Sequence, residues 1–200
     1  FETNTIGVEK EVLNVDDVIE TAITSAVLTW LLIMQKAALT EKIHQKNFTW
    51  FWRTAPAIPE KIGFAVGDYK KLPNEVGGMD TALPEEVADK MRPCWRNIAL
   101  RKKRYLGEDI LDFHVKFERI HPFQDGNGRV GRLIMFKECL KYNIVPFIIE
   151  DNLKMFYYRG LKEWDNEKGY LTDTCLTAQD KYKAYLDYFR IMYWNLNKTI

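Results

Sequence analysis

The dozen residues HPFQDGNGRVGR, His121 to Arg132, bring together side chains suited to acid–base and phosphate chemistry. A histidine near its ordinary pKa of about 6.5 can take a proton from an attacking hydroxyl. Asp125 can serve as a helix N-cap or as a ligand of Mg²⁺, which usually takes one or two carboxylates together with substrate phosphates. Arg129 and Arg132 fall on one side of a helix and can hold phosphate oxygens by forked hydrogen bonds.

The glycines of this stretch allow two interpretations. Gly126–Gly131 reads G-x-G-x-x-G, the pattern of a dinucleotide-binding turn, but that turn must follow a hydrophobic strand. The preceding Ile110, Phe113, Phe117 and Ile120 have helical spacing instead. The other interpretation is a helix, a tight loop and a second helix whose glycine-rich first turn offers free N–H groups to a phosphate.

Most of the remaining sequence has the periodicity of helices. A helix capped by Asn14 or Asp16 is expected to extend to Leu39, and another to begin at Thr40. Further helices are expected over residues 84–104, 108–120, 128–142, 152–164 and 177–194. Prolines and glycines concentrate between Ala55 and Leu83, where a loop or β-hairpin is expected. The fold class is therefore all-α with one inserted hairpin.

Composition narrows the setting. The 200 residues are enough for one domain with a substantial core, and the net charge of +1 argues against nucleic-acid and membrane-surface binding. Three widely spaced cysteines indicate neither a disulfide framework nor a zinc site, so a cytoplasmic location is expected. The longest uncharged run, residues 21–35, is shorter than the roughly 20 apolar residues of a membrane span, and no signal peptide is expected.

The stretch from His121 to Arg132 resembles the Fic motif H-P-F-x-[DE]-G-N-G-R-x-x-R of the Fic-domain AMP-transferases at every fixed position. The resemblance implies a single Fic-type domain over residues 1–200: a helical bundle with a short β-hairpin flap at 67–79, the Fic motif at 121–132 and an inhibitory-helix region at 1–12. In the related Doc toxins, which transfer phosphate, the Gly-Arg region is altered. The intact Gly128 therefore favours AMP transfer.

The resemblance also implies a reaction, in which AMP passes from Mg·ATP to a Ser, Thr or Tyr hydroxyl of a protein, with self-modification included. His121 would be the catalytic base and Asp125 the Mg²⁺ ligand. The family pattern places ATP against residues of the motif, the flap and a tyrosine pair: Gly126, Asn127, Gly128, Arg129, Gly131, Arg132, Val76, Gly77, Gly78, Tyr157 and Tyr158.

The flap and the tyrosine pair each have a second interpretation. On the family pattern, residues 68–79 would bind the protein target as an added strand; otherwise they form a solvated loop. Of the adjacent Tyr157 and Tyr158 only one is expected to face a nucleotide, since aromatic residues on a helix usually pack in the core. Asp165 stands where the family often has an asparagine, which leaves the adenine contact unassigned.

Many Fic proteins carry an inhibitory helix, [ST]-x-x-x-E-[GN], whose glutamate pairs with the second arginine of the motif. Residues 3–8 align with this pattern with Gly7 at the glutamate position, which would leave Arg132 free to bind ATP. A second frame places Glu9 there, followed by Lys10. The first frame is preferred because Ile6 then matches the family pattern, and it predicts a protein relieved of autoinhibition.

Alternatives remain open for the function. One is a Fic-like transferase of phosphate, UMP or phosphocholine, and another is a non-catalytic helical interaction domain. The sequence leaves the protein target and the oligomeric state open, and an oligomer is compatible with it. His114 is expected to be a packed residue that orients the motif, and the clusters Lys70–Lys71 and Arg101–Arg104 are expected to lie on solvated faces.

Overall fold

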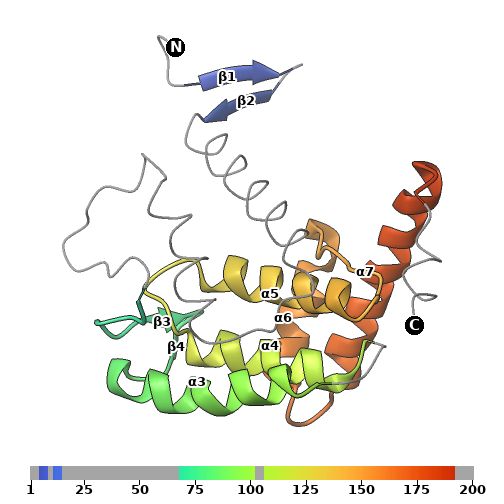
Figure 1. Cartoon of the computed structure of the whole chain (residues 1–200). Coiled ribbons are helices and arrows are strands. Elements are labelled where there is room, and N and C mark those ends of the chain that lie inside the picture. The colour runs from blue at the N-terminus through green and yellow to red at the C-terminus, as the bar shows by residue number, and fades with distance from the viewer. Residues whose placement is uncertain (1–4, 9–10, 15–67, 102–105, 192–200) are drawn as a thin grey trace.

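A computed structural model describes residues 5–8, 11–14, 68–101 and 106–191. Five α-helices lie within them, which confirms the mostly helical prediction (Figure 1). A short 3₁₀ turn, Asp151–Leu153, leads into the fourth of these helices. The helices are α3 (Pro84–Ala99), α4 (Glu108–Ile120), α5 (Asn127–Lys141), α6 (Lys154–Glu163) and α7 (Gly169–Tyr188).

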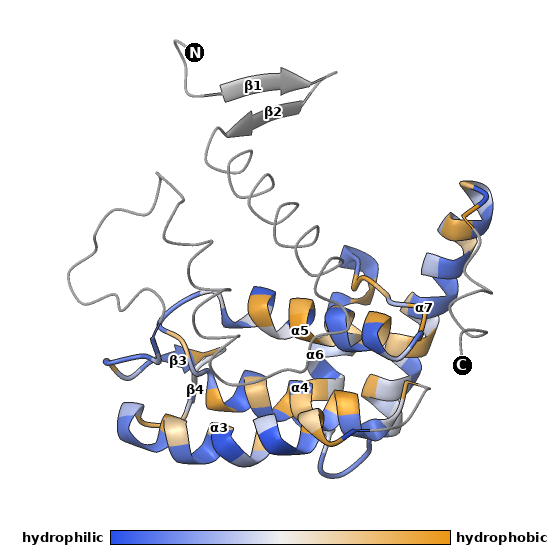
Figure 2. Cartoon of the chain, in the orientation of Figure 1, coloured by the Kyte–Doolittle hydropathy of each residue, from blue (hydrophilic) through white to orange (hydrophobic). Residues whose placement is uncertain are grey.

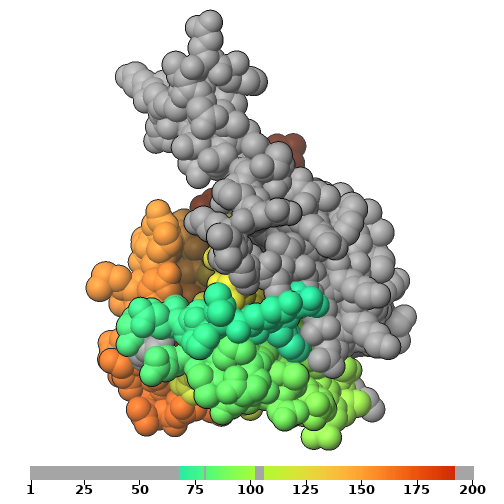
Figure 3. All heavy atoms as spheres, turned by 90° about the vertical axis from the view of Figure 1, so that its left-hand side faces the viewer, coloured from blue at the N-terminus to red at the C-terminus, as the bar shows by residue number. Residues whose placement is uncertain are grey.

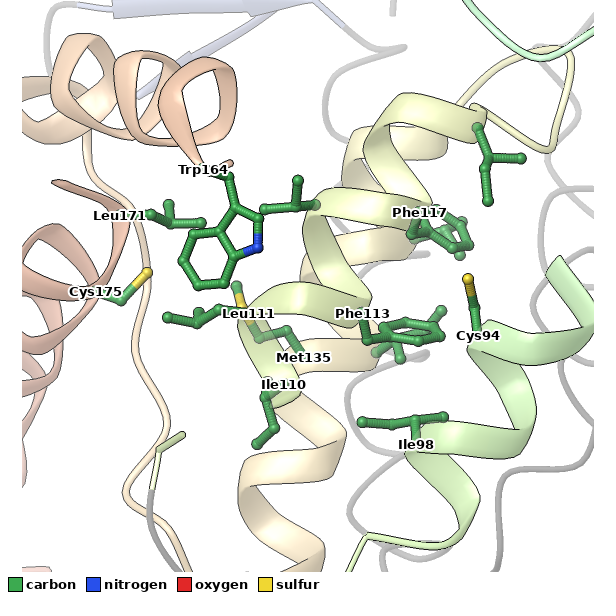
Figure 4. Packing of buried hydrophobic residues seen from close by; sticks show 14 of the residues in the cluster. Cys94, Ile98, Ile110, Leu111, Phe113, Phe117, Met135, Trp164, Leu171 and Cys175 are labelled. Carbon is green, nitrogen blue, oxygen red and sulfur yellow. The ribbon is translucent and has the colours of Figure 1, made fainter. Parts of the chain in front are cut away.

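Helix α4 lies at the centre of the bundle. It packs against α3 on one side and α5 on the other, while α6 packs along α7 (Figure 1). Figure 4 shows Phe113 and Phe117 of α4 beside Cys94 and Ile98 of α3, with Leu111 directed toward the Trp164 end of the core. A helix with apolar residues on more than one face can pack against several neighbours, so α4 gives the start of the motif, His121, a rigid support.

Helix α3 shows the opposite pattern, with one apolar face. Its buried Val87, Met91, Cys94, Trp95 and Ile98 recur at intervals of one turn, and the rest of the helix is hydrophilic (Figure 2). Its start follows the expected chemistry, because the Glu86 carboxylate accepts a hydrogen bond of 3.0 Å from the Leu83 N–H. The helix therefore covers α4 and faces solvent.

The boundaries of α7 differ from the prediction. The helix begins at Gly169, whereas the sequence pattern placed its start at residue 177. The hydroxyls of Thr172, Thr174 and Thr177 donate to the carbonyl oxygens of residues four positions earlier, at 3.0, 2.7 and 2.8 Å. These bonds engage the threonine hydroxyls within the helix itself.

The N-terminal region is a correction. Thr5–Val8 (β1) and Glu11–Asn14 (β2) form an antiparallel pair in which Gly7 lies opposite Val12, where the family pattern predicted an inhibitory helix at residues 1–12. Threonine, isoleucine and valine crowd a helix at Cβ and favour extended backbone, which accounts for strands here. The helices predicted between residues 15 and 54 lie outside the described residues.

Residues 68–81 contain a second, smaller antiparallel pair. Glu75–Val76 (β3) and Met79–Asp80 (β4) are joined by Gly77 and Gly78, whose φ angles of 57° and 74° are those of a tight hairpin turn. We call residues 68–81 the flap segment. In Figure 3 this teal segment crosses the face of the molecule above α3, with the yellow atoms of residues near 125 next to it.

No helix within the described residues combines the length and apolar character that crossing a membrane requires.

Candidate functional site

His121 ends helix α4 in a left-handed conformation. Its φ and ψ are 50° and 63°, and its N–H donates to the carbonyl oxygen of Phe117 at 2.9 Å. A non-glycine residue rarely adopts this conformation unless its surroundings hold it, and such residues concentrate at functional sites. The turn directs the chain into the loop 122–126 that leads to α5.

A second hydrogen bond fixes the tautomer of the His121 ring. The Nδ1 atom lies 2.9 Å from the carbonyl oxygen of Glu118, and a carbonyl can only accept, so Nδ1 carries the proton. Nε2 is then the proton acceptor of the neutral ring. Burial lowers the pKa of His121 and outweighs the Glu118 carbonyl, which raises it. The imidazole is therefore mostly neutral at pH 7, as a general base must be.

The loop after His121 is held by Asn127, which is 1% exposed. Its Oδ1 accepts from the Phe123 N–H and its Nδ2 donates to the Phe123 carbonyl, both at 2.8 Å. Both polar atoms of the Asn127 side chain therefore bind the loop backbone, and the predicted contact of Asn127 with ATP would have to be made by another part of the residue. Its backbone N–H belongs to the first turn of α5.

The start of α5 has the features of an anion site. Gly126, the N-cap, has φ 75° and carries no side chain to satisfy the first N–H groups of the helix. At Gly128, a Cβ would lie 3.1 Å from Nη1 of Arg132, so the guanidinium rests against this glycine. Arg129 places Nη2 3.7 Å from Oδ2 of Asp125. The N-terminus of α5 and the side chains of Arg129 and Arg132 therefore lie around one small region.

Asp125 suits the Mg²⁺ role that the family resemblance implies. Its side chain is 72% exposed, and its Oδ1 accepts a hydrogen bond from the Gly126 N–H at 2.6 Å. Among the described residues no group of three or more His, Cys, Asp or Glu side chains could hold a metal alone. One carboxylate beside a phosphate site is the arrangement in which Mg²⁺ takes its other ligands from phosphates and water.

Two predicted ATP residues are placed elsewhere. Gly131 is buried against α4, where a Cβ would lie only 2.8 Å from Oε1 of Glu118, so it permits close helix packing and does not face a phosphate. Tyr157 is 3% exposed and its hydroxyl lies 2.5 Å from Nε2 of His114. Tyr158 is 60% exposed and is the member of the pair that a nucleotide could reach.

Beneath the site lies a buried pair of titratable groups. His114 is fully buried, as expected, and burial lowers its pKa to about 3, so the ring is neutral. Burial raises the pKa of Glu118 to about 7, although the Arg132 charge acts in the opposite direction. Nε2 of His114 and Oε1 of Glu118 are 3.8 Å apart. Both residues belong to α4 and lie in its last turns before His121.

The other predicted contacts are mixed. Val76, Gly77 and Gly78 lie exposed at the tip of the flap segment. Asp165, at the position that the family often fills with asparagine, is ion-paired to Arg119 at 2.7 Å. Asp165, just after α6, is therefore tied to α4, and this ion pair leaves one carboxylate oxygen fewer for a hydrogen bond to an adenine ring.

Lys70 and Arg101 are corrections, since both were expected on solvated faces. Lys70 is 2% exposed and Arg101 is 6% exposed. Arg101 pairs with Asp109 at 2.8 Å and stacks on Tyr142, which accounts for its burial. Lys70, within the flap segment, lies between the base of the β3–β4 hairpin and the end of α4. The burial of these two side chains could not be predicted from the sequence, because a buried lysine or arginine and an exposed one are the same letter in the same kind of charged cluster.

The described residues bring together a neutral imidazole, a helix start flanked by two arginines and an exposed carboxylate. The sequence profile of the Fic/DOC family matches residues 35–139, more than half of the chain. The chain belongs to the Fic/DOC family.

Relatives match part of the chain. Protein adenylyltransferase Fic of Drosophila grimshawi is 31% identical over 98 residues, which cover 48% of this chain and 20% of that protein. The same-named protein of Drosophila sechellia is 43% identical over 49 residues, 24% of this chain and 10% of its own length. The match thus spans a fifth or less of these relatives.

Solved structures show the same fold. A Fic-domain-containing signaling protein from Bacteroides thetaiotaomicron superposes with a TM-score of 0.64 at 21% identity, covering 98% of this chain and 74% of that one. Fic-1 from C. elegans gives 0.62 at 16% identity, with 91% and 54% covered. The described helices therefore form a Fic-like fold.

Proposed function

We propose that this protein transfers AMP from Mg·ATP to a hydroxyl group of a protein target. The observation that carries the proposal is the hydrogen bond from Nδ1 of His121 to Glu118, because it leaves Nε2 as the acceptor beside the α5 anion site. The similarity to protein adenylyltransferases supports the choice of AMP as the transferred group.

The residues have separate roles in this reaction. Nε2 of His121 takes the hydroxyl proton as the oxygen forms a bond to the α-phosphorus. The bond from that phosphorus to the bridging oxygen breaks, and pyrophosphate leaves. Arg129, Arg132 and the α5 N–H groups hold the phosphate charge, and Mg²⁺ on Asp125 would neutralise more of it when bound.

The labelled atom of the donor nucleotide that reaches the protein shows which group is transferred. Cell lysate and Mg²⁺ are incubated with and without the protein, with ATP labelled either at the α- or at the γ-phosphate, with labelled UTP or with a labelled choline nucleotide, and only labelling above that of the lysate alone is counted. AMP transfer predicts protein labelling from α-labelled ATP alone, and a mass increase of one AMP. Labelling from the γ-position indicates phosphate transfer, and labelling only from UTP or a choline nucleotide indicates another group. Absence of any labelling contradicts the proposal.

We propose that the flap segment presents the target. Its exposed β3–β4 edge can pair with an extended peptide, and it lies against the loop that follows His121 (Figure 3). The prediction that Gly7 relieves autoinhibition is not retained, because the inhibitory helix on which it depends is replaced by β1 and β2.

A further inference from the structure

The ammonium group of Lys70 is buried between the base of the β3–β4 hairpin and the end of α4, with every proton engaged. Nζ donates to Oδ1 of Asn74 at 2.6 Å, to Oγ1 of Thr81 at 2.7 Å and to the carbonyl oxygen of Ile120 at 3.2 Å. Within the described residues no carboxylate lies at ion-pair distance, so three neutral oxygens replace its water. Lysine is almost never buried without a specific set of partners.

Two of these acceptors close the hairpin at its base. Asn74 precedes β3 and Thr81 follows β4, so one ammonium joins both ends of the turn. The Thr81 hydroxyl lies 2.7 Å from the Asn74 carbonyl oxygen and 2.6 Å from its Oδ1, and it can donate to either. The base of the hairpin is therefore held by side chains.

The same residues also form hydrogen bonds with the backbone on both sides of His121. The third acceptor, Ile120, immediately precedes the histidine, and the Lys70 N–H donates to the Pro122 carbonyl just after it at 2.8 Å. Asn74 adds a bond from Nδ2 to the Phe123 carbonyl at 2.9 Å. That carbonyl also accepts from Asn127, so the flap segment and the start of α5 share one acceptor.

The strand pair alone could not fix this geometry. β3 and β4 have two residues each, and the tip is exposed. An isolated two-stranded hairpin is marginally stable even when longer. The hydrogen bonds at its base must therefore hold it against the His121 loop.

We propose that Lys70 is a positioning residue, whose ammonium clasps the base of the β3–β4 hairpin to the backbone around His121 and so sets where a bound target hydroxyl lies relative to Nε2. The part that concerns the target rests on the proposed function, whereas the clasp itself does not. Methionine would fill the space of the lysine stem but would remove the one donor that Asn74, Thr81 and the Ile120 carbonyl share, so the ammonium is what joins them.

Hydrogen exchange of the whole chain tests the clasp without reference to catalysis. Lys70→Met is compared with Lys71→Met, which alters the adjacent exposed lysine. The expected result is exchange about ten-fold faster in peptides covering residues 74–81 and 121–124, with α5 to α7 unchanged and Lys71→Met like wild type. Equal exchange in both variants and wild type, or equal acceleration in both variants, overturns the proposal.

If Lys70→Met does not fold, Thr81→Val takes its place, because it removes one acceptor and keeps the shape of the side chain. The same local acceleration is then expected, to a smaller extent. Unchanged exchange in a folded Thr81→Val counts against the clasp.

Transfer assays test the positioning role. With α-labelled ATP and lysate, Lys70→Met is expected to lower protein labelling about 10- to 100-fold while its Kd for Mg·ATP stays within about two-fold of wild type. Lys70→Arg should restore part of the labelling. A parallel loss of ATP affinity, or full labelling by Lys70→Met, contradicts this role. If wild type labels nothing, the proposed function fails, and hydrogen exchange still decides the clasp.

Discussion

His121 and Glu118 are joined by a hydrogen bond of 2.9 Å from the imidazole Nδ1 to the backbone carbonyl oxygen. The bond lies within the last turn of α4, so the secondary structure that ends at the histidine also selects its tautomer. The same residue, Glu118, places its carboxyl oxygen against the α-carbon of Gly131, where α4 and α5 touch. The proposed base, His121, and helix α5 are therefore both positioned by the last turn of α4.

His121→Asn is expected to abolish transfer, lowering the rate by at least about 100-fold, while nucleotide binding stays largely intact. Asparagine tolerates the left-handed backbone and cannot act as a base. His121→Ala should lose activity equally, with a lower Tm because alanine is strained at φ 50°. Labelling and thermal melting of both variants provide the measurements. Persistent labelling in either one contradicts the assigned base.

The rate of transfer is expected to fall at acid pH as His121 is protonated. Burial and the Lys70 charge lower the pKa of the imidazole below its ordinary value of 6.5, so the neutral ring predominates at neutral pH. Lys70→Met removes one of these causes and should move the acid limb of the pH–rate profile to higher pH. Asp125→Asn should move the pKa of His121 the other way, since the Asp125 carboxylate raises it. NMR titration of the ring gives the same comparison without turnover.

Two glycines on α5 are expected to respond differently to alanine. In Gly131→Ala the new Cβ would lie 2.8 Å from Oε1 of Glu118 and 3.1 Å from Cδ1 of Phe117, which should lower the free energy of unfolding by about 1–3 kcal/mol. In Gly128→Ala it meets only the mobile end of Arg132 at 3.1 Å. That variant should keep its Tm but bind ATP more weakly. Urea unfolding and ATP titration separate the two; matching stability losses would show that Gly128 is also a packing residue.

Stability should depend on pH through two opposing groups. The pKa of His114 is lowered from 6.5 to about 3, so its contribution is lost as pH falls through this range. The pKa of Glu118 is raised from 4.5 to about 7, so its contribution is lost as pH rises from 4.5 to 7. Between pH 4.5 and 6.5 the two dependences oppose each other.

Glu118→Gln should remove one of them. Relative to wild type, its free energy of unfolding should then rise with pH by up to about 1.4 kcal/mol per unit between pH 4.5 and 6.5. Urea unfolding at several pH values measures this difference. A pH-independent difference would mean that Glu118 titrates normally in the folded protein.

Asp125→Asn is expected to remove most Mg²⁺-dependent transfer. The amide can still accept from the Gly126 N–H, so the start of α5 and the Tm should be preserved, whereas the charge that binds a cation is lost. Rates measured against Mg²⁺ concentration test this. Unchanged activation by Mg²⁺ would exclude Asp125 as its ligand.

The sequence by itself determined the helical class, the bounds of α4 and the identity of the chemical groups in HPFQDGNGRVGR. Each of these follows from local chemistry: apolar periodicity for α4, and glycine, arginine, aspartate and histidine spacing for the motif. The start of α7 differs from the prediction because its first turns pack against α6, where Leu171 lies against Gly160, and the sequence does not show that tertiary contact. The N-terminal pattern was misread because a short family resemblance outweighed β-branched residues that favour strands.

Only the tertiary structure decided which of these groups face the site. In the fold, the Tyr157 hydroxyl points inward to His114, and Tyr158 stays exposed. Gly131 lies where α5 packs against α4. The tertiary structure also buried Lys70, whose three acceptors come from positions 4, 11 and 50 residues away in the chain. A side chain's role depends on partners that folding brings from distant positions, and spacing along the chain does not encode where those partners meet.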